Sequence, residues 1–178
     1  MKRGYSQGVV IAAVLVTAAV VAQAQQFRGE GAQTEVARAL PEAAHDFDFT
    51  IGRWNISQVG GGNATDTIKS FGGGVAITEK MRAPGFAAST VTVFDSTLGT
   101  WTQTYLDNQG VYAQQTGGRV GDDIVLVGPL VDAGGATHLS RLRYIHIARG
   151  SFDQVGEEST DDGATWTETF RLQFRKAS

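Results

Sequence analysis

The sequence contains no cysteine in its 178 residues. Disulfides, thiolate metal ligands and cysteine nucleophiles are therefore excluded, and stability must come from packing and backbone pairing. A lipoprotein anchored through a lipidated cysteine is excluded for the same reason.

The sequence also has no excess of basic over acidic residues. The whole chain has 15 basic and 18 acidic residues, and without Lys2 and Arg3 the balance is 13 to 18, a net charge of −5. Nucleic acids and anionic membranes attract proteins through a basic surface. We therefore expect neither as a partner.

Familiar catalytic motifs are absent: the sequence has no HExxH, nucleophile elbow or phosphate-binding loop. The eight residues from His138 to His146 would put these side chains about 26 Å apart on one strand, too far to share a metal ion. His45 lies beside Asp46 and Asp48, where a capping or salt-bridge role is expected. We predict no metal site and no cofactor.

The N-terminus has the layout of a secretory signal. Lys2 and Arg3 precede an apolar run at 8–21, and Ala22-Gln23-Ala24 offers a cleavage site. The alternative is a retained anchor, but this run is shorter than the about 20 residues that span a bilayer. We predict a signal peptide at 1–24, export to the periplasm or the outside, and no stable membrane span after cleavage.

The remaining chain is long enough for one domain with its own core. Residues 25–44 are expected to form a leader and a short helix, with helical spacing over 34–45 (TEVARALPEAAH). Thr34 could cap this helix, and Pro41 either breaks it or starts a second short turn.

From residue 45 onward, short alternating segments are separated by glycine, asparagine and aspartate. This pattern of short alternating segments and turn residues predicts an all-β domain over 45–178, an antiparallel up-and-down barrel of about eight to ten strands. The tight links between segments make neighbours in sequence neighbours in space. The ten expected strands are 52–59, 65–70, 74–82, 88–95, 99–107, 110–117, 123–128, 139–148, 151–159 and 165–175.

One turn has a specific pattern: STDDGATW at 159–166 matches the Asp-box S-x-D-x-G-x-T-W. Serine and aspartate can bond the backbone of such a turn, and glycine can take a positive φ. A structural turn is the favoured interpretation. Calcium binding by Asp161 and Asp162, or catalysis, are the alternatives.

Two expected strands carry polar groups that could face a cavity. Glu79 shares a face with Ile77 and Met81, so it is either a buried carboxylate with a perturbed pKa or part of a solvated outer face. On the segment 99–107, one face could stack a ligand and bind it by hydrogen bonds, or form an outer face of cross-strand pairs. That face consists of Trp101, Gln103, Tyr105 and Asp107.

Further candidates lie nearer the C-terminus. Arg141 shares a face with apolar residues and could meet Glu79 or Glu157 inside a barrel, bind an anionic group, or face solvent. Gln154 and Glu157 lie on opposite faces of one strand, so at most one of them points inward.

Three segments together carry a resemblance: HDFDFTIGRWNI at 45–56, the F-D and G-x-W-x-Q-x-Y-x-D of 94–107, and the QVGEESTDDGATW tail. They resemble a bacterial family of uncharacterised exported proteins with a lipocalin-like, calycin-type β-barrel. The resemblance implies a helix that plugs one end, a cavity at the other, and Trp54 as the barrel-closing tryptophan. Nitrobindin-type barrels bind haem through a histidine near the C-terminus, but here the last histidine is His146 and the motif after Trp54 differs.

The expected function is the binding of a small, partly apolar molecule in the cavity. Its ligand-binding candidates are Trp54, Glu79, Trp101, Gln103, Tyr105, Asp107, Arg141, Gln154 and Glu157. One alternative is an isomerase, cyclase or hydrolase with Glu79 or Asp107 as the base and Tyr105 or Arg141 stabilising an anion. Another is a protein-interaction module with a filled core, and the chain is expected to be a monomer or homodimer.

Overall fold

The computed structural model describes residues 40–131 and 135–178. The predicted signal peptide, leader and first part of the predicted helix lie outside the described residues. Within the described ranges, no helix has the length and apolar character needed to cross a membrane.

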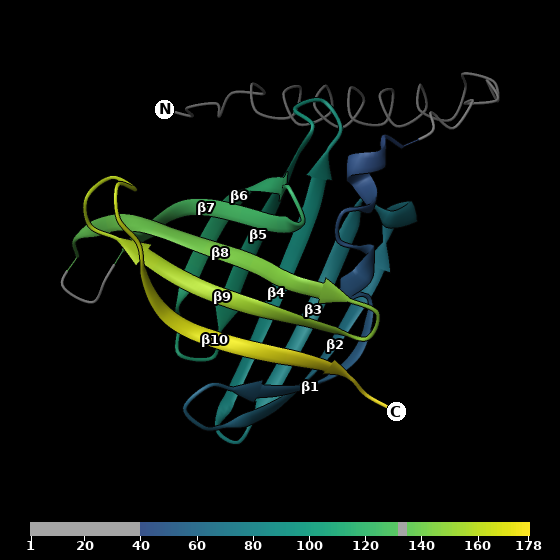
Figure 1. Cartoon of the computed structure of the whole chain (residues 1–178), viewed down its shortest axis with the longest axis horizontal. Coiled ribbons are helices and arrows are strands. Elements are labelled where there is room, and N and C mark those ends of the chain that lie inside the picture. Colours follow the sequence, from purple (N-terminus) through teal and green to yellow (C-terminus); the bar gives the residue numbers. More distant parts are fainter. Residues whose placement is uncertain (1–39, 132–134) are drawn as a thin grey trace, which may run out of the picture. The chain divides into compact units, whose positions relative to one another are not determined.

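Ten antiparallel strands form a closed barrel, which confirms the predicted all-β, up-and-down architecture (Figure 1). Each strand pairs with its neighbours in sequence, and β1 pairs with β10 to complete the ring. The strands are β1 (Gly52–Gln58), β2 (Asn63–Phe71), β3 (Ala76–Ala83), β4 (Phe86–Asp95), β5 (Thr100–Asp107), β6 (Tyr112–Val120), β7 (Asp123–Val131), β8 (Thr137–Ala148), β9 (Ser151–Ser159) and β10 (Thr167–Lys176).

Alternation along each strand separates the interior from the outer face. In β4, Ala88, Thr90 and Phe94 are buried, whereas Val91 and Val93 are exposed. Successive side chains of a strand point to opposite faces of the sheet. The pattern of one buried residue in two therefore fixes which residues line the barrel.

The helical material is shorter than expected. The described part of the predicted helix holds one 3-10 turn, η1 (Glu42–His45), and a second turn, η2 (Asp48–Thr50), follows it. Pro41 immediately precedes η1 with a φ of −64°, so it starts a short turn, one of the two roles predicted for it. The third 3-10 segment is η3 (Gly72–Gly74), in the β2–β3 connection.

Aromatic side chains close the barrel end next to these turns. Phe47, from the link between η1 and η2, packs edge-on against Trp101 and Tyr144 at ring-centroid distances of 4.9 and 5.2 Å. Deeper in the same core, Phe152 stacks on Phe174 at 4.3 Å. Such rings bury large apolar areas, so this end of the barrel is filled rather than hollow.

Two glycines allow β6 and β7 to approach closely. A Cβ at Gly128 would overlap the carbonyl oxygen of Gln114, and one at Gly117 would overlap that of Val125. Neither carbonyl can move without disturbing the sheet. Glycine is therefore required at both positions for steric reasons.

Candidate functional site

Phe47, Trp101 and Tyr144 form what we call the aromatic plug at one end of the barrel. A cavity of about 490 Å³ occupies the opposite half. It is partly open and reaches the β1–β2, β3–β4 and β5–β6 hairpins, where Gly62, Ala83 and Val111 line it. Most of its wall is apolar and comes from strands around the whole ring, including Ile56, Met81, Leu130, Leu142, Phe170 and Leu172. The size and lining are typical of a small-molecule site.

Polar side chains gather at the inner end of this cavity, in a layer that we call the polar belt. Glu79 pairs across the ladder with Thr90, and Thr90 pairs with Tyr105, so these three lie in one row of the interior. The belt lines the cavity with Glu79, Thr90, Gln103, Tyr105, Gln115 and Gln154. Glu79, Gln103 and Gln154 also line a small void of about 10 Å³ between the belt and the plug.

Glu79 has an unusual electrostatic environment. Its removal from bulk water and the neighbouring Asp66 carboxyl hold the pKa of Glu79 well above its usual range, although Thr90 donates a hydrogen bond that opposes this. Its side chain retains partial exposure because it faces the cavity. Glu79 is therefore a carboxyl group that favours the protonated form.

Asp66 lies beside Glu79 on the adjacent strand and is only 2% exposed. Burial raises its pKa as well. The Glu79 side chain and the backbone of Thr67 and Lys80 oppose this rise, and Asp66 does not line the cavity. The interior therefore contains two adjacent acids that both favour the protonated form.

Gln103 connects the belt to the plug. Its side-chain amide donates to Thr92 Oγ1 at 3.1 Å and to the Tyr144 hydroxyl at 2.8 Å. Burial, followed by the nearby Glu79 charge, raises the pKa of Tyr144. Tyr144 therefore stays a neutral phenol, and Gln103 is held in place by two strands besides its own.

Tyr105 and Asp107 interact at the cavity wall. The Tyr105 hydroxyl donates to Asp107 Oδ2 at 3.0 Å, and burial is the main cause of its raised pKa. Partial desolvation of Asp107 is outweighed by hydrogen bonds from the amides of Val111 and Gln109, so its pKa is lowered. Asp107 thus organises the β5–β6 hairpin and does not line the cavity.

The two tryptophans proposed for the site lie below it. Trp54 is 2% exposed and donates from Nε1 to the carbonyl oxygen of Thr50 at 2.6 Å. Trp101 is 1% exposed and donates to the carbonyl oxygen of Ala43 at 2.9 Å. Both connect strands to the 3-10 segment, so they support the closed end and do not line the cavity.

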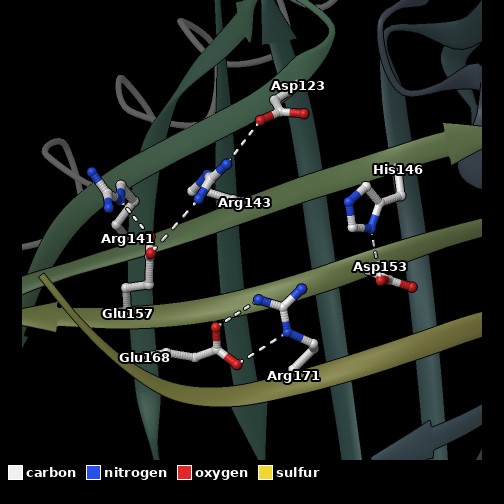
Figure 2. Close-up of polar contacts among 8 residues, drawn as sticks. All are labelled: Asp123, Arg141, Arg143, His146, Asp153, Glu157, Glu168 and Arg171. Atoms are coloured by element: carbon white, nitrogen blue, oxygen red, sulfur yellow. Dashed lines mark hydrogen bonds and ion pairs between the residues drawn. The ribbon is translucent and has the colours of Figure 1, made fainter. Parts of the chain in front are cut away.

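Arg141 and Glu157 lie on the outer face, which corrects the idea that they meet inside the barrel. Leu142 of β8 and Gly156 of β9 line the cavity, so their sequence neighbours point outward. Arg141 donates from Nε to Glu157 at 2.5 Å. The dashed line between them in Figure 2 marks this contact. Of the alternatives left open for Arg141, a position on the outer face is the one observed, and Arg141 does not meet Glu79.

These two residues belong to a network of ion pairs on the outer face of β7 to β10 (Figure 2). Arg143 bonds Asp123 at 2.9 Å and lies 3.7 Å from Glu157, while Arg171 makes two bonds to Glu168. The network explains why an outward residue such as Val155 is only 1% exposed, because Arg143 and Arg171 are its direct cross-strand neighbours.

The segment 159–166 forms a hydrogen-bonded turn. Ser159 Oγ accepts from the amide of Gly163 at 2.8 Å and donates to Asp161 Oδ1 at 2.7 Å. Both the hydroxyl and the amide of Thr165 donate to Asp161, and they lower its pKa to about 2. Trp166 lies under the Arg141 guanidinium, 4.1 Å from its ring centroid.

No group of three or more His, Asp or Glu side chains in residues 40–131 and 135–178 is arranged to hold a metal ion. His45 Nδ1 lies 2.9 Å from Asp48, and His146 Nδ1 lies 3.0 Å from Asp153. The region around His146 departs from regular strand geometry, with a φ of 51° and a register shift between β8 and β9.

Asp66, the buried acid next to the cavity-lining Glu79, was not among the residues predicted for the site. It lies in Asn63–Phe71, where Ala64, Asp66 and Ile68 alternate with Thr65, Thr67 and Lys69. An acid between two apolar residues on one strand face is the same signal that identified Glu79. Tyr144 carried a weaker signal, because its face also contains the polar Ser140 and His146.

Neither models of known protein families nor curated proteins match this sequence.

Proposed function

We propose that this protein is an exported β-barrel that binds a small, partly apolar molecule in its interior. The observation that carries the proposal is the cavity of about 490 Å³, with apolar walls and a polar belt at its inner end. Apolar walls provide affinity, and a few fixed polar groups provide orientation. Gln103, Tyr105, Gln154 and Glu79 are the proposed ligand contacts, with Trp54 and Trp101 supporting the floor.

The finer classification is also a proposal. The short turns before β1, the buried Trp54 and the closed barrel support a lipocalin-like fold. The sequence pattern supports an Asp-box at 159–166, and the N-terminal sequence supports export to the periplasm or outside. We retain a monomer or homodimer as the proposed state.

An enzyme is the second candidate, favoured by one specific observation. Glu79 faces the cavity with a raised pKa, and a carboxyl group of this kind can act as a general acid or base. Arg141 is not available for this chemistry because it lies on the outer face. The filled-core interaction module has less support, because it predicts an interior without a cavity of this size.

Native mass spectrometry of the protein purified from its own host tests the main proposal. We expect an additional mass that is released on unfolding, and extraction would give its chemical class. The matched variants are Ala88→Leu, which puts a larger side chain into the cavity wall, and Ala87→Leu on the neighbouring residue outside the lining.

Ala88→Leu should lower ligand occupancy by about tenfold, because added methylene groups displace the ligand from the wall. Ala87→Leu should retain the ligand. A protein that carries no additional mass, or an occupancy that Ala88→Leu leaves unchanged, would contradict the proposal.

A further inference from the structure

The described wall of the cavity contains an acidic side chain and no basic one. Glu79 is the only acid that lines the cavity, and no Lys, Arg or His is among the described residues of its wall. Asp66 is a diagonal neighbour of Glu79 on the same interior face, because Asp66 pairs with Met81 and Glu79 pairs with Ile68. Two neighbouring carboxyl groups thus lie in and beside a cavity whose described wall has no basic residue.

The groups that face Glu79 from the other strands do not supply a positive charge. Asp66 approaches it from β2, Tyr105 from β5 and Tyr144 from β8, and Thr90 on β4 donates a hydrogen bond. All of these groups are neutral or acidic. Buried acids are normally paired with a cation or kept protonated, because an unpaired buried charge is costly.

Asp66 adds a second acidic group. It is 2% exposed and is not part of the cavity wall, so it lies next to the ligand site rather than in it. Burial raises its pKa, although Glu79 and the backbone of Thr67 and Lys80 oppose this rise. A cation bound at Glu79 would also favour the ionised form of Asp66, because opposite charges attract.

We propose that the cavity selects an organic cation: a protonated amine on an apolar body, with the ammonium group at Glu79, next to Asp66. This inference rests on the proposed ligand-binding function and names its substrate class. The apolar part would lie along the wall formed by Met81, Leu142, Phe170 and Leu172. An ammonium has several N–H donors and a charge, so it suits adjacent carboxyl groups that accept hydrogen bonds.

Other ligand classes fit less well. A carboxylic acid would bring a third acidic group into the same interior. A divalent metal ion such as Ca²⁺ prefers six to eight oxygen ligands, more than one acid in an apolar wall and a second beside it provide. A neutral alcohol could fill the cavity but would leave the acid pair protonated and gain no ionic interaction.

Three probes of equal chain length test the choice: octylamine, octanol and octanoic acid, each titrated into the protein by calorimetry below its micelle concentration. We expect octylamine to bind about tenfold more tightly than octanol, because hydrogen bonds to charged groups are stronger than neutral ones. Octanoic acid should bind most weakly. Amine binding should also release up to about one proton, because the ammonium favours the ionised acids. Titration in buffers of different ionisation enthalpy measures this release.

Glu79→Gln keeps the shape of the side chain and removes its charge, and should lower octylamine affinity to that of octanol. Octanol binding should stay within about twofold, which shows that the variant is folded and its cavity intact. Glu168→Gln, an exposed acid on the outer face, is the matched control and should change none of the three affinities.

Equal binding of octylamine and octanol would overturn the amine proposal and leave the cavity-binding function standing. So would an amine preference that persists in Glu79→Gln. If no probe binds although the host-purified protein carries a released ligand, the amine proposal alone fails. If no probe binds and no ligand is released, both proposals fail.

Discussion

At the residue scale, two carboxyl groups show how environment determines acidity. Glu79 is desolvated next to another acid, so its pKa is raised. Asp161 is exposed and accepts hydrogen bonds from Thr165 and Ser159, so its pKa falls to about 2. The folded surroundings of Glu79 destabilise its ionised form, whereas those of Asp161 stabilise its ionised form.

The raised pKa of Glu79 predicts an unusual dependence of stability on pH. Below the usual glutamate pKa, Glu79 is protonated in both folded and unfolded chains and makes no difference. As pH rises from the usual glutamate pKa to the raised folded value, Glu79 ionises in the unfolded chain but stays protonated in the folded one, and stability falls by about 1.4 kcal/mol for each unit by which the pKa is raised. Above the folded value, stability falls no further. Glu79→Gln should remove most of this fall, as measured by denaturant unfolding between pH 4 and 9.

Glu168→Gln is the comparison for this experiment. Hydrogen bonding to Arg171 lowers the pKa of Glu168, so its contribution is present at neutral pH and lost on acidification. Its replacement should not remove the fall at higher pH. If Glu79→Gln shows the same loss of stability with rising pH as the unmodified protein, Glu79 is not the group responsible.

At the scale of elements, the strands could be predicted from sequence because each is short, alternates and ends in turn residues. All ten expected segments overlap the observed strands. On β8 it was harder to predict which face points into the barrel. Ile145 and Ile147 share a face with Arg141 and made that face look apolar. Long arginine side chains cover apolar surface from outside, so hydrophobicity alone did not separate the two faces.

The same reasoning explains what could be anticipated of the site. Glu79 and Gln103 were recognisable because polar groups alternate with apolar or aromatic ones that must be buried. A cavity was implied only by the resemblance, because its volume and lining depend on how ten strands curve and on which side chains leave space between them. The closeness of Asp66 and Glu79 likewise depends on the register of β2 against β3.

The contact between β6 and β7 predicts a position-specific effect of alanine. Gly128→Ala should destabilise the protein by about 1–3 kcal/mol, because the new Cβ overlaps the backbone carbonyl of Gln114. Gly118→Ala is the control on the neighbouring strand, since nothing lies within 4 Å of its Cβ position. Thermal and denaturant unfolding measure both. Equal stabilities for the two variants would contradict the close approach.

At the scale of the whole molecule, the pairing of β1 with β10 joins the first and last strands. Trp54 pairs with Lys176, and the amide of Ala177 donates to the carbonyl oxygen of Arg53 at 2.9 Å. A closed barrel has no unpaired edge that could recruit another chain. The C-terminal strand is therefore necessary for closure as well as for the core.

Removal of residues 174–178 should open the barrel. The deletion takes away Phe174 from the core and exposes an edge of β1, so we expect a lower unfolding temperature and a shift to larger species in size-exclusion chromatography. Removal of Ser178 alone should change neither. A chain without 174–178 that unfolds and elutes like the full protein would show that closure by β10 is dispensable.

The aromatic plug gives the barrel two unlike ends. Phe47, Trp101 and Tyr144 fill one of them, so a molecule held at the polar belt would exchange with solvent past the hairpins at the other. Its polar end would be the first part to enter and the last to leave. Belt residues would then control equilibrium selectivity, while hairpin residues such as Val111 would control residence time, and substitutions could change one without the other.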